Sequence, residues 1–201
     1  MSYLQRSAII VLLLGLAACG QVNLLGTERT GRAEITGLDD ALETAAVIST
    51  IDYERPRLLI RGSADPSFRA VVPKDEETAA LIDSVGLASD GALYQFRVRT
   101  NSDDWMFWSS ARYSVGGGVE SLSMERLGSD VSCSGRTCDH YEIMAATVSR
   151  SVVESMASAD TTVTVRLSSR RGDRDFGVEP NEARVFLTAV DSVRARVGIV
   201  N

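Results

Sequence analysis

The chain has 201 residues and a formal net charge of −6, with 44% hydrophobic and 24% charged residues. This composition excludes a disordered chain or a coiled coil, and the length suits one domain with a core of its own. The acidic balance gives no electrostatic reason to bind nucleic acid or an anionic membrane surface, so no nucleic-acid partner is expected.

The first element in chain order is an apolar run, residues 8–19, which follows Arg6 and ends in small residues directly before a cysteine. The run is too short to span a bilayer as a helix. Its basic start, apolar stretch and small-residue end are typical of an export signal. An ordinary secretory signal that happens to end beside a cysteine is the alternative.

The segment Leu16-Ala17-Ala18-Cys19 resembles the lipobox of bacterial lipoproteins. The resemblance implies that residues 1–18 are removed as a signal peptide and that Cys19 then carries a diacylglycerol and an acylated amine. Gly20, not aspartate, follows Cys19. By analogy with lipoprotein sorting, this implies the outer membrane of a Gram-negative cell, with the domain facing the periplasm. The rest of the chain resembles proteobacterial envelope lipoproteins only in general, without a motif specific to one role.

Residues 19–37 are polar and punctuated by Gly and Thr, which predicts a flexible tether, and residues 38–201 are expected to form a single β-rich globular domain. Apolar residues at helical spacing predict a short helix over residues 38–48. The β-branched residues from Val47 onward favour a strand instead, and this alternative stays open.

Short strands are predicted at residues 57–61 and 68–72, separated by a turn at 62–66, and one or two helical turns at 76–85. The clearest strand signal is the alternation from residue 93 to 100, which predicts that one face of the strand is wet. The residues on that polar face are Leu93, Gln95, Arg97 and Arg99.

A longer strand is predicted from Trp105 to Val115, ending at a glycine turn, residues 116–118. Both of its faces carry bulky side chains. Either the strand is buried on both sides, or some of these side chains form a surface for a partner or ligand. The residues of this candidate surface are Trp105, Met106, Trp108 and Tyr113.

Strands are next predicted at residues 119–133 and 138–148, joined by a loop that Cys133 and Cys138 close. An exported chain with one close pair of cysteines is most simply explained by a local disulfide. Redox motifs usually leave two residues between the cysteines, whereas four intervene here. Gly135 supplies the positive φ that a tight loop needs.

The remaining elements are a helix at 148–157, a strand at 161–168 and a C-terminal helix that begins with Glu179 and Pro180. Proline and acids in a first turn, followed by an apolar stripe, are typical of a helix start. The order of elements predicts an α+β fold, mainly antiparallel β in a sandwich-like sheet, with a C-terminal helix.

No convincing catalytic set is present. His140 is the only histidine, so it lacks the partners that a zinc site needs, and no Gly-x-Ser-x-Gly elbow accompanies it. The alternating acids of residues 173–179 lack the spacing of a calcium loop and predict a charged hairpin or strand. No catalytic residue, metal or other cofactor is therefore expected.

These observations predict a non-enzymatic, lipid-anchored cell-envelope protein that acts as an interaction or structural module. Its expected partners are the membrane, through the lipid on Cys19, and an envelope protein. The alternative is a lipoprotein that binds a small ligand or a glycan through the aromatic strand, and a hydrolase of unrecognised geometry comes third.

Overall fold

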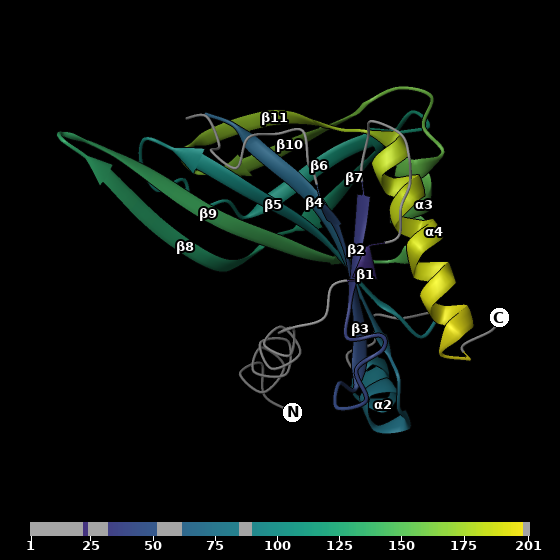
Figure 1. Ribbon diagram of the computed structural model, residues 1–201. Helices are drawn as coiled ribbons and strands as arrows, with labels where there is room; N and C mark the ends of the chain where they lie inside the picture. The colour runs from purple at the N-terminus through teal and green to yellow at the C-terminus, as the bar shows by residue number, and fades with distance from the viewer. Residues whose placement is uncertain (1–21, 24–31, 52–61, 85–89, 199–201) are drawn as a thin grey trace.

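The computed structural model describes residues 22–23, 32–51, 62–84 and 90–198. Its strands form a seven-stranded and a four-stranded sheet, and every pairing is antiparallel. Three helices are described: α2 (Glu76–Ser84), α3 (Arg150–Ala157) and α4 (Pro180–Arg196). The predicted α+β fold, mainly antiparallel β with a C-terminal helix, is confirmed (Figure 1).

The strand order defines two sheets. The larger sheet runs β1 (Val22–Asn23), β2 (Arg32–Thr36), β3 (Ala45–Ile51), β4 (Ala64–Pro73), β5 (Leu93–Ser102), β9 (Thr137–Val148) and β8 (Glu125–Ser134). The smaller runs β11 (Gly172–Val178), β10 (Val163–Ser169), β6 (Ser110–Val115) and β7 (Gly118–Ser123).

The main core lies on one face of the larger sheet, which packs against α4 and the smaller sheet. Phe68 stands at its centre, with ring centroids 5.5 Å from both Phe96 and Phe186. The buried cluster begins at Ala33, on β2. Strand β2 therefore belongs to the folded domain, which corrects the expectation that the tether extends over all of residues 19–37.

Helix α4 shows why the C-terminal prediction succeeds. Pro180 stands in its first turn, basic residues stand in its last turn, and the stripe that contains Phe186 and Val190 is fully buried. Each feature fits the helix dipole or the core. None of the helices among the described residues is long and apolar enough to cross a membrane.

The predicted helix at 38–48 is wrong. Residues from Ala45 form β3, which pairs with β2 on one side and β4 on the other. Pairing on both edges outweighs a weak helical period. In the turn before β3, Leu42 is 92% exposed. The side chain of Lys74 stabilises this turn by donating to the carbonyls of Gly37 and Asp40.

Other strand predictions need smaller corrections. Strand β4 begins at Ala64, inside the predicted turn at 62–66, and the predicted strand at 57–61 lies outside the described residues. The helical turns predicted at 76–85 form α2, and those at 148–157 form α3. The single strand predicted at 119–133 is two strands, β7 and β8. They separate at Met124, whose N–H donates to the carbonyl of Ser109.

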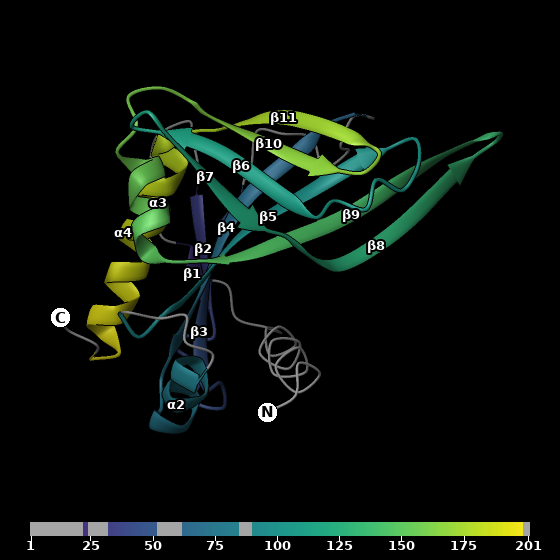
Figure 2. The same ribbon diagram turned by 180° about the vertical axis from the view of Figure 1, so that it is seen from behind.

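Strands β8 and β9 form a hairpin that extends away from the rest of the molecule (Figures 1 and 2), and we call it the arm. Gly135 turns its tip with φ 63°, and a Cys133–Cys138 disulfide joins the two strands there. The pairing register shifts between Arg126 and Gly128. Strand β8 is the last strand of its sheet, so its outer edge is unpaired within the described part of the chain.

Candidate functional site: an aromatic loop on a buried carboxylate

The chain from β5 to β6 carries most of the candidate residues. The predicted strand from Trp105 to Val115 is regular only from Ser110, and residues 103–109 form a loop that leads from the larger sheet to the smaller. We call residues 103–109 the aromatic loop. Its side chains have three different environments: Trp105 and Met106 are half-buried, Phe107 is 48% exposed, and Trp108 is buried.

The carboxylate of Glu142 fixes the backbone of the aromatic loop. The residue lies on β9 and is fully buried. Its carboxylate accepts hydrogen bonds from the backbone N–H of Met106 at 2.8 Å and from that of Phe107 at 3.0 Å. A buried charge is costly unless hydrogen bonds satisfy it, and charge-assisted bonds to backbone N–H groups are among the strong ones. The carboxylate thus gives the loop the partners that a neighbouring strand would otherwise supply.

Phe107 has an unusual backbone. Its φ is 57°, and no other non-glycine residue of the described ranges has a positive φ. For a residue with a side chain this conformation costs about 1–2 kcal/mol. It persists here because Glu142 fixes the N–H groups of Phe107 and of the residue before it. The consequence is that the phenyl ring is turned outward instead of into the core.

Two arginines face the exposed ring. The guanidinium carbon of Arg171 lies 5.1 Å from the centroid of Phe107, and that of Arg126 lies 5.6 Å away, so both make cation–π contacts. Arg171 also donates to Asp104 at 2.5 Å and to the carbonyl of Trp105 at 2.7 Å. A backbone hydrogen bond from Trp105, together with Arg171, lowers the pKa of Asp104 below its ordinary value.

The buried side chain of Trp108 anchors the loop to the core. Its indole N–H donates to the hydroxyl of Thr100 at 3.1 Å, and the guanidinium of Arg174 lies 5.3 Å from its ring. Trp108 and Tyr113 are each only 3% exposed. The prediction that these two belong to a partner surface is therefore wrong, because both side chains are part of the core, with Thr100 accepting from the indole of Trp108 and Ser155 bonded to the hydroxyl of Tyr113. Trp105 and Phe107 are the accessible aromatic residues of the loop.

His140 lies two residues before Glu142 on the same face of β9. Its ring meets that of Trp105 edge-on, with centroids 4.8 Å apart. Ser102 lies directly opposite His140 on β5, and both the Ser102 hydroxyl and the His140 Nδ1 are buried without a hydrogen-bond partner among the described residues. Glu142 already binds the loop with both oxygens. Serine, histidine and acid are thus near each other without being linked as a nucleophile, a base and an orienting acid.

A substitution at His140 tests whether this neighbourhood is catalytic. We expect His140→Gln to change the free energy of unfolding by less than about 1 kcal/mol, because the ring makes one aromatic contact. We also expect the variant to rescue a deletion strain as well as the wild type does, at equal protein level. Complementation together with urea unfolding measures both. Failure of rescue by a stable, equally abundant variant would show that the histidine has a chemical role.

The acids of residues 173–179 do not converge on a common point. Asp173 and Asp175 lie on β11, as the strand prediction for this stretch required, and Asp175 pairs across the hairpin with Arg166 at 2.6 Å. Glu179 precedes α4 and accepts from the hydroxyl of Thr162. Within the described residues no group of three His, Cys, Asp or Glu side chains is arranged to hold a metal ion. These charges stabilise a solvated hairpin instead.

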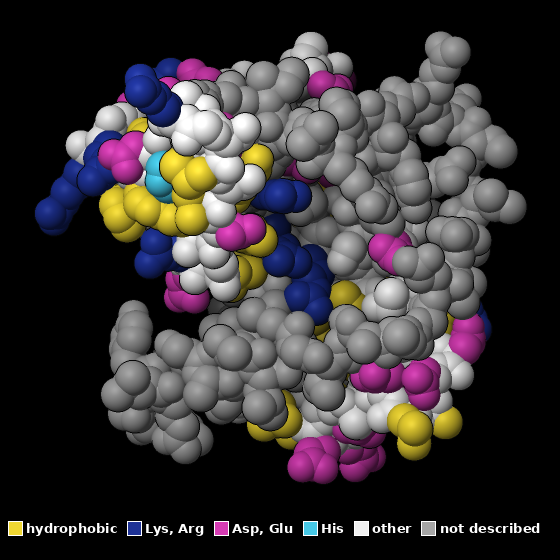
Figure 3. All heavy atoms as spheres, turned by 60° about the vertical axis from the view of Figure 1, so that its left-hand side comes forward, with side chains coloured by type: hydrophobic (Ala, Val, Ile, Leu, Met, Phe, Trp, Pro, Cys, Tyr) yellow, Lys and Arg dark blue, Asp and Glu magenta, His cyan; other side chains and the backbone are white. Residues whose placement is uncertain are grey.

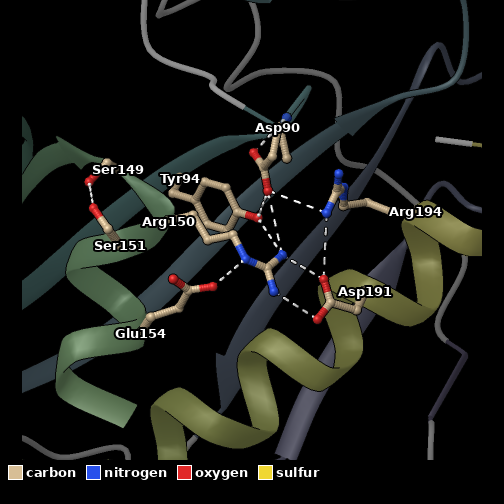
Figure 4. A network of polar contacts seen from close by, with 9 residues as sticks. Asp90, Tyr94, Ser149, Arg150, Ser151, Glu154, Asp191 and Arg194 are labelled. Carbon is tan, nitrogen blue, oxygen red and sulfur yellow. Dashed lines mark hydrogen bonds and ion pairs between the residues drawn. The ribbon is translucent and has the colours of Figure 1, made fainter. Parts of the chain in front are cut away.

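A second polar cluster joins the helices to the sheet (Figure 4). Arg150 on α3 donates to both oxygens of Asp191 on α4, at 2.5 and 2.8 Å, and lies 3.5 Å from Asp90. Tyr94 donates to Asp90 at 2.7 Å; burial and this acceptor raise the pKa of its hydroxyl above the ordinary value. Arg194 on α4 also lies 3.4 Å from Asp90. Because both arginines face carboxylates and Tyr94 stays protonated, the cluster joins the helices to the sheet rather than serving as a reactive centre.

Comparisons with protein-family models, with curated proteins and with solved structures found no match to this chain. Cys19, the predicted lipid attachment residue, lies outside the described residues.

Proposed function

We propose that this protein is a non-enzymatic interaction module of the Gram-negative cell envelope, anchored by lipid on Cys19 to the periplasmic side of the outer membrane. Its aromatic loop binds a partner protein. The observation that carries the proposal is the backbone of Phe107, which Glu142 holds in a left-handed conformation so that a large apolar side chain faces solvent.

This arrangement of Phe107 destabilises the isolated molecule and is compensated only when a partner binds. A strained backbone and an exposed phenyl ring each raise the free energy of the folded state. A partner that buries the ring gains its apolar area, and because the loop is held rigidly, little conformational entropy is lost on binding. Aromatic residues and arginine are also the side chains that contribute most at protein interfaces.

The side chains of the loop indicate which surface properties the partner must have. Arg126 and Arg171 flank Phe107. A matching surface has an apolar pocket for the ring and carboxylates at the rim of that pocket. The glycan-binding alternative needs an open aromatic face of the predicted strand for a sugar, whereas Trp108, the largest aromatic side chain of that alternative, is buried. The protein-binding alternative fits better.

Photo-crosslinking in intact cells tests the proposal. The probe replaces Ser129, an exposed residue of β8 directly opposite Glu142 and thus close to the loop. We expect a discrete adduct with one envelope protein. We expect Phe107→Gly to reduce it at least about tenfold, because interface anchors contribute about 2 kcal/mol or more. Glycine accepts the left-handed backbone, so this substitution removes the ring while keeping the loop conformation.

Val119→Ala is the matched control, because Val119 is 72% exposed on β7 and lies outside the loop. The control should leave the adduct unchanged. Equal adduct yields in the wild type, Phe107→Gly and Val119→Ala would contradict the assignment of the loop as the contact site.

A further inference from the structure

The face of the larger sheet that points away from the main core carries a pair of arginines. In the β4–β5 register Arg69 stands opposite Gln95, and Arg97 stands opposite Ser67. Directly opposite residues share a face, and so do residues two apart on one strand, so these four side chains project together. Figure 3 shows Lys and Arg side chains gathered beside the arm, on the side of the molecule toward which the arm extends.

Both arginines are withdrawn from solvent. Arg69 is 6% exposed and Arg97 is half-buried. Burial lowers the pKa of both guanidinium groups, and for Arg69 burial and the neighbouring Arg97 bring the pKa to about 10. Two cations side by side in a medium of low dielectric constant repel each other more strongly than they do in water. Their placement therefore costs stability unless something compensates their charge.

No carboxylate of the described residues forms an ion pair with either arginine. By contrast, Arg150, Arg166, Arg171 and Arg196 each form an ion pair with an Asp or Glu. A guanidinium group as deeply buried as that of Arg69 is normally paired.

We propose that Arg69 and Arg97 form a binding site for the phosphate group of a small ligand or headgroup. A guanidinium group binds phosphate oxygens in pairs, through two parallel N–H donors. A phosphate monoester carries up to two negative charges near neutral pH, which matches two adjacent cations better than one carboxylate does. The site is on the opposite face of the sheet from Glu142 and is independent of the function proposed for the aromatic loop.

The neighbouring side chains suit the same ligand. Ser49 and Thr147 stand in one row with Arg69 and Gln95 across four strands, and Ser67 stands beside them. Hydroxyl groups donate to phosphate oxygens without adding charge. The nearest acids that the register assigns to this face are Asp65, opposite Arg99 and diagonal to Arg97, Glu34, beyond Ser49, and Glu125, beyond Ala145. The side chains directly opposite the two arginines are uncharged.

The test is thermal unfolding of the full-length protein in a non-ionic detergent, with inorganic phosphate added against sodium chloride at equal ionic strength. We expect phosphate to raise the unfolding temperature in a saturable manner, because a ligand that binds only the folded state stabilises it. We expect Arg97→Gln and Arg69→Gln each to weaken phosphate binding at least about tenfold. Without phosphate neither variant should unfold earlier than wild type, because each removes a repulsive charge.

Arg112→Gln is the control for charge, because Arg112 is exposed on β6 of the other sheet. This control should keep the full phosphate effect. Arg97→Gln alone decides the result if the more buried Arg69 variant does not fold. The proposal is overturned if phosphate has no effect beyond that of chloride, or if Arg97→Gln responds like Arg112→Gln.

A final comparison identifies the source of the phosphate group. Inorganic phosphate is compared with phosphatidic acid in mixed micelles at the same concentration of phosphate groups, with phosphatidylcholine as the neutral lipid. A stronger effect of phosphatidic acid assigns a lipid headgroup to the site, and a stronger effect of inorganic phosphate assigns a free phosphate. Both outcomes require the loss in Arg97→Gln, and the absence of that loss overturns the proposal in either case.

Discussion

Replacing Glu142 with alanine is expected to destabilise the protein by about 3–5 kcal/mol and to release the aromatic loop. The substitution leaves the N–H groups of Met106 and Phe107 without their acceptor and opens a cavity beside Arg174 and Trp108. Guanidinium-induced unfolding measures the loss of stability. Because the loop then loses its left-handed backbone, the adduct formed from position 129 should fall as far as it does in Phe107→Gly.

Two further variants separate the charge of Glu142 from its shape. Glu142→Gln keeps the volume but presents one acceptor and one donor to the two N–H groups, so an intermediate loss of about 1.5–3 kcal/mol is expected. Glu125→Ala removes an exposed acid from β8 and should change stability by less than about 0.5 kcal/mol. A loss below about 1 kcal/mol in Glu142→Ala would show that the carboxylate does not hold the loop.

The second large effect concerns anchoring. We expect wild-type protein to incorporate palmitate and to fractionate with the outer membrane, and we expect Cys19→Ser to lose the label and the processing that removes residues 1–18. Several acyl chains together hold a protein firmly at a membrane, whereas one chain gives only reversible binding. Loss of the cysteine therefore changes the location of the whole population.

The matched control removes the other two cysteines of the chain. The double variant Cys133→Ser, Cys138→Ser breaks the disulfide at the tip of the arm and should keep both the label and the membrane location. Wild-type protein in the soluble periplasmic fraction, or unchanged processing of Cys19→Ser, would contradict lipid anchoring.

The sequence predicts the elements whose signals are local. Helix α4 carries its own start in Pro180 and its own buried stripe, and β5 shows the alternation of a strand over residues 93–100. The helix predicted at 38–48 failed because β3 owes its structure to partners on both sides, which no local window contains.

The aromatic loop escaped prediction for the same reason. The run from Trp105 to Trp108 has the composition of a strand, yet its conformation depends on Glu142, which is 36 residues from Met106 in the sequence. A signal for Glu142 does exist. It alternates with Met144, Ala146 and Val148, all of which face the core, and an acid in that series predicts a buried carboxylate that needs hydrogen bonds.

The prediction for the polar face of β5 was also incomplete. Alternation indicated a wet face for Gln95 and Arg97, but Gln95 is 3% exposed and Arg97 is half-buried. Alternation shows which side chains share a face and says nothing about what covers that face. Their polarity was visible in the sequence, whereas the absence of a described carboxylate partner for Arg69 and Arg97 became visible only in the structure.

The edge of β8 that has no partner strand within the described ranges also affects how copies of the protein behave at high concentration. A bare strand edge is a template on which a second copy can extend the sheet, and long, flat, apolar edges aggregate. This edge has few apolar side chains, is charged at Glu125 and Asp130, and changes register between Arg126 and Gly128. Two arms therefore cannot align as regular strands along their whole length, and the break in register contributes to the colloidal stability of the molecule.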